Sequence, residues 1–316
     1  MYEQKLQDSR MDDVEVTHAG TMWANQPVIL AASGLLIAVL LVFLVTRFLE
    51  PEHLFPAPVN SRFGYIDKSG KMVIAPQFEN AGQFADDLAP VLENGKWGYV
   101  DGHGRVTITP QFDIADPFAD GRAMVGSAGK LGYIDKSGKF AIAPQFQGAG
   151  EFGEDRAPAA VNGSWGFIDK DGKWVISPQF DEAGTFSEGF AVVRLGHQYG
   201  YIQKSGSIEI NPQFAMAGDF HDGLAVVKIG DRFGYIDKDG KVQIQPQFDA
   251  AGDFSDGLAV AAIGARYGYI DKHAKFKINP QFDKGGTFRD GLAPVWLGDR
   301  QGYVNKDGKY VWNPTS

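Results

Sequence analysis

The sequence predicts an all-β repeat protein, and two recurring spacings carry that prediction. A glycine recurs every 34 residues without insertion or deletion, from Gly64 to Gly302, and a Pro-Gln-Phe triplet recurs at the same interval from Pro76 to Pro280. A constant period of this length is the signature of a repeat architecture. Because 40 Gly and 16 Pro are spread through a chain that is 44% hydrophobic, the array has many turns and still enough apolar residues for a core.

Each unit is predicted to begin with a β-hairpin rather than with helices. Helical tetratricopeptide arrays also have a 34-residue period, but every unit here has a Pro in its middle, and Pro inside a helix costs about 3 kcal/mol. Short runs rich in aromatic and β-branched residues, such as 165–168 and 173–176, flank the turn sequence 169–172. In that turn Asp169 can cap the backbone and Gly172 permits a positive φ.

A third strand follows the sequence Ala-Gly-x-Phe-x-Asp-Gly, as at 251–257, and is typified by residues 258–262. Each unit is therefore expected to be a three-stranded antiparallel meander. The repeated glycine of the first strand is expected where a neighbouring unit approaches too closely for a Cβ. The glutamines of the Pro-Gln-Phe triplets are expected to form amide hydrogen bonds between units.

The ends of the array favour a closed ring. Seven full units start at Phe63, and the last hairpin, residues 301–314, lacks a third strand. A step of 34 aligns Leu54 with Leu88, the start of a third strand, so the N-terminus could supply the missing strand of the last unit. We therefore predict eight 34-residue units in a β-propeller-like closed ring, with an open β-solenoid as the alternative.

Four segments are predicted along the chain. Residues 1–26 form an N-terminal tail, 27–46 a transmembrane helix, 47–60 a Pro-rich spacer leading into the first strand, and 61–316 the β-repeat domain. Residues 27–46 contain no charge, and twenty helical residues match a hydrocarbon core of about 30 Å. A cleaved signal peptide is disfavoured because the preceding segment is acidic and no small-x-small site follows.

Composition and motifs exclude several function classes. The net charge is −9 and no stretch concentrates Lys and Arg, so no nucleic-acid partner is expected. The absence of cysteine excludes disulfides, thiolate metal sites and a cysteine nucleophile. No metal-binding, phosphate-binding or Ser/His/Asp motif is present. We therefore expect no catalytic, cofactor-binding or metal-binding residues.

Two sets of residues are candidates for a ligand or partner surface. One acid per unit precedes the third strand, and Asp120, Asp222, Asp256 and Asp290 belong to this set. Such a ring of carboxylates would bind cations or sugar hydroxyls, although capping of the turn is the more frequent use. Trp97, Trp165 and Trp296 could stack on sugar rings, although aromatic residues more often serve the core.

The motifs at 96–101, Lys-Trp-Gly-Tyr-Val-Asp, and at 164–181 resemble the WG-containing repeat family. The resemblance covers residues 54 to 314. It departs at the Trp that gives the family its name, which is replaced by Phe63, Leu131, Tyr199, Phe233, Tyr267 and Gln301 in the other units. The resemblance implies β-repeat interaction modules, often exported or associated with the bacterial envelope, and supplies no catalytic residues.

The resulting hypothesis is a membrane-anchored, non-catalytic scaffold that presents a β-repeat surface to an envelope protein or a polysaccharide. We expect a single-pass inner-membrane protein with a periplasmic repeat domain. Two alternatives stay open. One is a hydrolase or lyase with a site assembled from distant units. The other is a cytoplasmic regulatory module tethered to the membrane, because Arg47 is the basic residue nearest to the span.

Overall fold

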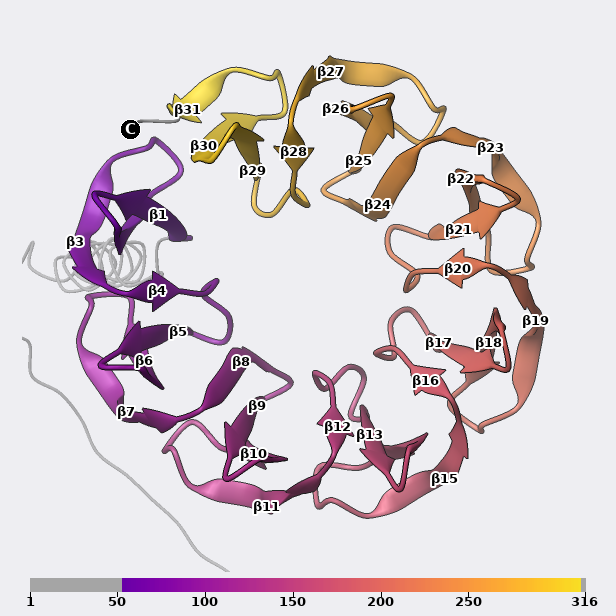
Figure 1. The fold of residues 1–316 in the computed structure, drawn as a ribbon, viewed down its shortest axis with the longest axis horizontal. Helices are drawn as coiled ribbons and strands as arrows, with labels where there is room; N and C mark the ends of the chain where they lie inside the picture. The colour runs from indigo at the N-terminus through magenta and orange to yellow at the C-terminus, as the bar shows by residue number, and fades with distance from the viewer. Residues whose placement is uncertain (1–52, 314–316) are drawn as a thin grey trace, which may run out of the picture. The chain divides into compact units, whose positions relative to one another are not determined.

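The computed structural model describes residues 53–313, which form 31 strands and no helix. The strands make eight antiparallel sheets, arranged as blades around a central opening (Figure 1). The repeat domain is therefore an eight-bladed β-propeller. The predicted all-β ring is confirmed, and the open solenoid is wrong.

The first blade has three strands and each of the others has four. Blade 1 contains β1 (Phe55–Val59), β2 (Arg62–Ile66) and β3 (Met72–Phe78). Blade 2 contains β4 (Asn80–Ala81), β5 (Leu88–Glu93), β6 (Lys96–Asp101) and β7 (Val106–Phe112). Blade 3 contains β8 (Ile114–Ala119), β9 (Arg122–Ser127), β10 (Lys130–Ile134) and β11 (Phe140–Phe146). Blade 4 contains β12 (Gly148–Ala149), β13 (Ala157–Val161), β14 (Ser164–Ile168) and β15 (Trp174–Phe180).

The remaining blades repeat this order. Blade 5 contains β16 (Glu182–Ala183), β17 (Phe190–Leu195), β18 (Gln198–Gln203) and β19 (Ile208–Phe214). Blade 6 contains β20 (Met216–Ala217), β21 (Ala225–Ile229), β22 (Arg232–Ile236) and β23 (Val242–Phe248). Blade 7 contains β24 (Ala250–Ser255), β25 (Leu258–Ile263), β26 (Arg266–Ile270) and β27 (Phe276–Phe282). Blade 8 contains β28 (Lys284–Gly285), β29 (Leu292–Leu297), β30 (Arg300–Asn305) and β31 (Tyr310–Trp312).

The prediction of three strands per unit missed the innermost strand. This strand lies beside the central opening and is only two residues long in most blades, as in β4 and β12 (Figure 1). In blade 2 it pairs through Asn80 opposite Leu92 and Ala81 opposite Val91. Two residues are too few to produce a period-2 hydrophobic pattern, so pairing with the next strand is what makes them a strand.

The blade boundaries also differ from the predicted units. The strand placed third in each unit pairs with the hairpin that follows it, as β5 pairs with β6. The N-terminal strand β1 therefore pairs with β2 and completes blade 1, whereas the last hairpin already pairs with β29. The predicted exchange of a terminal strand is wrong. The predicted spacer 47–60 is also too long, because Phe55–Val59 is already a strand.

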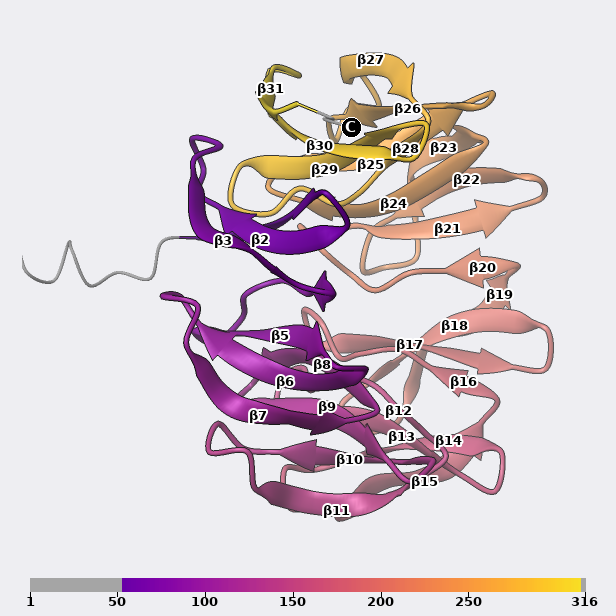
Figure 2. The same cartoon turned by 60° about the vertical axis from the view of Figure 1, so that its left-hand side comes forward.

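The hydrophobic core lies between blades rather than within them. Each of eight clusters joins buried side chains of two adjacent blades, as where Tyr99 and Phe112 of blade 2 meet Phe118 and Val125 of blade 3. The eighth cluster joins Phe55 and Ala57 of β1 to Tyr303 of β30 and closes the ring. Figure 2 shows blade 1 beside blade 8. A single blade has no core of its own, which is why the units must stack.

The repeated glycine is confirmed as a point of close approach, but the neighbour is its own blade. A Cβ on Gly98 would lie 2.4 Å from the carbonyl oxygen of Ile108 and 2.6 Å from the nitrogen of Pro110. At this point the outermost strand bulges, because Trp97 pairs with Phe112 but Tyr99 pairs with Ile108. The proline fits there because a bulge and an outer edge do not need its missing N–H.

The predicted tail 1–26 and transmembrane helix 27–46 lie outside the described residues. Between residues 53 and 313 there is no helix of sufficient length and hydropathy to cross a bilayer.

Candidate binding site

One face of the ring carries the turns that lead from the first to the second strand of blades 2 to 8, and we call it the carboxylate face. Each of these turns is a tight two-residue turn, as where Ala85 and Leu88 exchange backbone hydrogen bonds around Asp86 and Asp87. Both central residues have positive φ, 52° and 72° in that turn. Asp followed by Gly, the commonest pair at this position, suits such a turn because both tolerate the left-handed region.

The acid of each turn reaches the turn of the next blade. The Oδ2 atom of Asp86 accepts a hydrogen bond of 2.9 Å from the backbone N–H of Gly121, 35 residues later. The same bond recurs from Asp155 N–H to Asp120, Gly189 N–H to Glu154, Gly223 N–H to Glu188, Gly257 N–H to Asp222, and Gly291 N–H to Asp256. These carboxylates therefore link successive blades around the carboxylate face.

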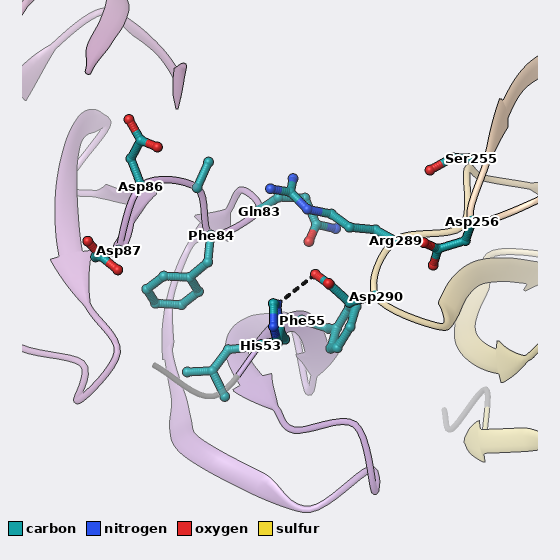
Figure 3. Close-up of a pocket in the computed structure, with 12 residues that line it drawn as sticks. His53, Phe55, Gln83, Phe84, Asp86, Asp87, Ser255, Asp256, Arg289 and Asp290 are labelled. Atoms are coloured by element: carbon teal, nitrogen blue, oxygen red, sulfur yellow. Dashed lines mark ion pairs between the residues drawn. The ribbon is translucent and has the colours of Figure 1, made fainter. Parts of the chain in front are cut away.

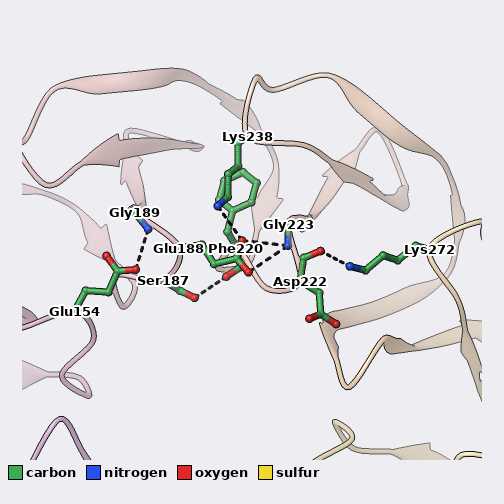
Figure 4. Close-up of polar contacts among 9 residues, drawn as sticks. All are labelled: Glu154, Ser187, Glu188, Gly189, Phe220, Asp222, Gly223, Lys238 and Lys272. Carbon is green, nitrogen blue, oxygen red and sulfur yellow. Dashed lines mark hydrogen bonds and ion pairs between the residues drawn. The ribbon is translucent and has the colours of Figure 1, made fainter.

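Lysines from the hairpin turns of later blades add charge pairs to these links. Lys204 lies 2.9 Å from a carboxylate oxygen of Glu154. Lys238 lies 3.0 Å from a carboxylate oxygen of Glu188 (Figure 4). Burial opposes ionisation of Glu154, but the hydrogen bonds from Lys204 and from Gly189 N–H outweigh it and hold its pKa below the ordinary value. Glu154 is thus an ionised acceptor at neutral pH.

The structure therefore assigns a structural role to three of the four predicted ligand acids. Asp120, Asp222 and Asp256 each accept a backbone N–H from the next blade. The fourth, Asp290, pairs instead with the side chain of His53, whose Nδ1 atom lies 2.8 Å from Asp290 Oδ2. His53 stands at the repeat position that Gly121 occupies in blade 3, so this pair closes the ring of links.

The three predicted tryptophans do not form a common site. Trp97, Trp165 and Trp296 lie in blades 2, 4 and 8, near the turns that join the second and third strands, at the face opposite the carboxylates. Trp97 and Trp165 pack against the interblade clusters. Trp97 and Trp165 therefore contribute to the packing between blades.

The glutamines of the Pro-Gln-Phe triplets were predicted to form hydrogen bonds between units, and this prediction is wrong. The side-chain amide of Gln145 donates to the carbonyl of Ala143 in its own strand, and Gln281 donates to that of Asn279 in the same way. These glutamines lie on the outer strand and are exposed.

The feature that breaks the ring's symmetry is a cavity at the junction of its two ends. It has a volume of about 450 Å³ and is lined by blades 7, 8, 1 and 2 (Figure 3). We call it the seam cavity. Its polar lining residues are His53, Gln83, Asp86, Asp87, Ser255, Asp256, Arg289 and Asp290. Its apolar lining comes from Leu54, Phe55, Phe84 and Ala85.

Among residues 53–313, blade 1 has no strand inside β1, and the seam cavity lies beside the start of β1. In blade 2, Leu92 pairs with Asn80 of the innermost strand, whereas its equivalent in β1 is Pro58, which has no N–H to offer. Phe84, which follows β4 in blade 2, borders the cavity. That ring is only partly buried, whereas its six repeat equivalents, from Phe118 to Phe288, are 1–3% exposed.

A second group of acids, missed by sequence reasoning, lies in the innermost strands or in the segments that follow them. Asp116, Glu151, Asp219 and Asp253 have pKa values above the ordinary range, chiefly because burial removes water. Burial and the charge of Asp253 raise the pKa of Asp219 to about 6. The Oδ1 atoms of Asp219 and Asp253 are buried without a hydrogen-bond partner among the described residues. Their only sequence signal is a position one or two residues before a buried Phe.

Fold and site together define this protein as a β-propeller with one cavity-bearing seam. Models of the WG containing repeat match seven consecutive segments, residues 63–97, 97–130, 132–165, 165–196, 199–232, 233–265 and 267–299. The chain therefore belongs to the WG-containing repeat family. The predicted family is confirmed.

Solved structures share the fold at low sequence identity. The dihydro-heme d1 dehydrogenase NirN, in complex with DHE, is 15% identical, with a TM-score of 0.56 over 83% of this chain and 72% of that one. A eukaryotic initiation factor is 9% identical, with a TM-score of 0.52 over 82% of this chain and 95% of that one. A search of curated proteins found no match. At these identities the likeness concerns the fold alone.

Proposed function

We propose that this chain is a non-catalytic binding module that engages a protein partner through the seam cavity. The supporting observation is the contrast between repeated and unrepeated polar groups. The repeated acids hold neighbouring blades together, as Asp222 does for Gly257. The seam cavity combines some of these acids with side chains that do not recur, above all Arg289, whose equivalents in blades 2 and 7 are Ala85 and Ser255.

The size of the cavity supports recognition of a side chain or a short peptide. About 450 Å³ lies within the range of small-ligand sites, roughly 300–1,000 Å³. Its apolar wall and charged rim combine the two features that give such sites affinity and orientation. Among residues 53–313, no three His, Asp or Glu side chains are grouped so that they could hold a metal ion.

Site-specific photo-cross-linking in cells that express the full chain tests this proposal. A photo-reactive amino acid at Lys136 would report on the cavity rim, because Lys136 Nζ lies 3.4 Å from an Asp87 carboxylate oxygen. Lys130, at the other end of β10 and on the opposite face, is the matched control. We expect a discrete adduct from position 136 and none from 130. Equal labelling at both, or none at 136, would reject the seam as the binding surface.

We further propose that residues 27–46 anchor the module in the inner membrane with the propeller in the periplasm. The uncharged twenty-residue run and the envelope association of similar repeats support this. The full chain should stay in the membrane pellet after an alkaline wash, and a chain lacking 27–46 should not. Protease should digest the propeller in spheroplasts; protection until lysis would place it in the cytoplasm instead.

A further inference from the structure

The wall of the seam cavity contains the aromatic ring of Phe84. The equivalent phenylalanines of the other blades are buried. Phe84 is partly exposed, and its ring packs against Tyr65 with centroids 4.8 Å apart. Phe186, the equivalent of Phe84 in blade 5, already contacts a cation. The guanidinium of Arg156 lies over its ring, 5.6 Å from the centroid. A ring face open to a cavity can attract a cation because its π-electron face is negative.

The charge of the lining has the matching sign. Four carboxylates, those of Asp86, Asp87, Asp256 and Asp290, face one guanidinium, that of Arg289, and the His53 imidazole. Asp86 and Asp256 each accept only a neutral backbone N–H, so their charges are not cancelled by that bond. Asp87 is 69% exposed, and Lys136 approaches its carboxylate only to 3.4 Å. The lining therefore carries a net negative charge.

We propose that the seam cavity binds a basic side chain, arginine or lysine, presented by a protein partner. The aliphatic stem packs on Phe84, and the charged end lies among the carboxylates of Asp86, Asp87 and Asp256. The inference rests on the proposed binding function and adds the chemistry of the ligand. Arg289 projects into the same space (Figure 3) and repels an incoming cation, which limits the affinity of a single side chain.

Arg289 makes the proposal sharply testable. Ala85 occupies its repeat position in blade 2, and Ser255 does so in blade 7, so the turn accepts a small residue there. Arg289→Ala should therefore fold normally and bind a cation more tightly. If the ligand were an anion, the same substitution would remove its main attraction and abolish binding.

The experiment is fluorescence anisotropy on the full chain in detergent micelles. The probe is a fluorescein-labelled, capped pentapeptide with one central arginine between glycines, and the comparison peptide has citrulline, which keeps the shape without the charge. We expect the arginine peptide to bind about tenfold more tightly than the citrulline peptide. Arg289→Ala should strengthen arginine binding by about threefold or more. Equal binding of the two peptides, or lost binding in Arg289→Ala, would overturn the proposal.

Two further variants separate specific binding from general attraction by an acidic protein. Asp87→Asn should weaken binding several-fold. Asp155→Asn, at the same turn position in blade 4 and 78% exposed, should not change it. Phe84→Leu keeps apolar volume but removes the ring and should also weaken binding. Circular dichroism confirms folding of each variant. Equal effects of Asp87→Asn and Asp155→Asn would show that the attraction is non-specific and would reject the site.

These outcomes also separate the two proposals. A cross-linked partner at Lys136 without arginine-selective peptide binding would refute only the basic-side-chain ligand. Arginine-selective binding that Asp87→Asn weakens supports the ligand chemistry even where the cellular partner differs from an envelope protein.

Discussion

The hydroxyl of Tyr303 donates a hydrogen bond to the carbonyl oxygen of Pro56, 2.9 Å away and 247 residues earlier in the chain. Six repeat equivalents of Tyr303 donate instead to the innermost strand of the next blade or to the residue just after it. They are Tyr65, Tyr99, Tyr133, Tyr201, Tyr235 and Tyr269. At the seam the bond goes to the second-strand position, where β1 lies. This bond joins blade 8 to blade 1 and closes the ring.

Replacing Tyr303 with Phe should lower the free energy of unfolding by about 1–2 kcal/mol, because the buried Pro56 carbonyl loses its donor. The variant should still fold, since Phe167 occupies the equivalent position in blade 4. Urea unfolding of the variant measures the loss. Tyr310→Phe, on a ring that is 37% exposed, should change stability by less than about 0.5 kcal/mol. Similar effects of the two substitutions would contradict the closing role of Tyr303.

Asp222 is predicted to matter for stability and not for ligand binding. Asp222→Ala removes the acceptor of Gly257 N–H and places Ala at a φ of 54°, so the free energy of unfolding should fall by about 1–2 kcal/mol. Asp222→Asn keeps an acceptor and tolerates the left-handed region, and it should cost less than half as much. Both should bind the arginine peptide as the unaltered protein does. Weakened binding with unchanged stability would restore the ligand-binding role that the sequence suggested.

Asp219 should make the propeller less stable at neutral pH than it would be with a neutral side chain. Its pKa is about 6 in the folded protein because of burial and the nearby charge of Asp253, against 3.8 for an ordinary Asp. Between about pH 4 and pH 6 the folded state holds a proton that the unfolded chain releases, so the free energy of unfolding falls as pH rises through this window. The loss is complete above pH 6.

Asp219→Asn should therefore raise the free energy of unfolding at pH 7 by about 2 kcal/mol and have little effect at pH 4. Asn is close in size, and the buried Oδ1 position against Gly184 is kept. Urea unfolding at the two pH values measures the difference. Asp239→Asn, at a carboxylate that is 72% exposed, is the control and should be neutral at both. A gain of equal size at pH 4 and pH 7 would show that charge is not the cause.

The candidate site was accessible from the sequence only in part. The acids of the carboxylate face were found because they recur at a regular spacing. A residue that links each blade to the next is expected to recur in this way. The residues at the seam cavity form no regular sequence pattern, because they differ from their equivalents in other blades. Pro58 occupies the repeat position of Leu92, Arg289 that of Ala85, and His53 that of Gly121. These residues form a cavity only because the fold brings blades 7, 8, 1 and 2 together.

The amino-acid sequence by itself determined the period, the strand character of the units and their number, because turn residues and apolar alternation act over a few neighbours. It also aligned Leu54 with Leu88 at the start of a strand, and β1 begins one residue later, at Phe55. Only the tertiary structure decided how strands are grouped into blades, that two-residue innermost strands exist, and that the ends meet through Tyr303 and Pro56. Those features depend on contacts between residues up to 247 positions apart. No local pattern encodes such contacts, and here they create both the closed ring and its one unequal interface.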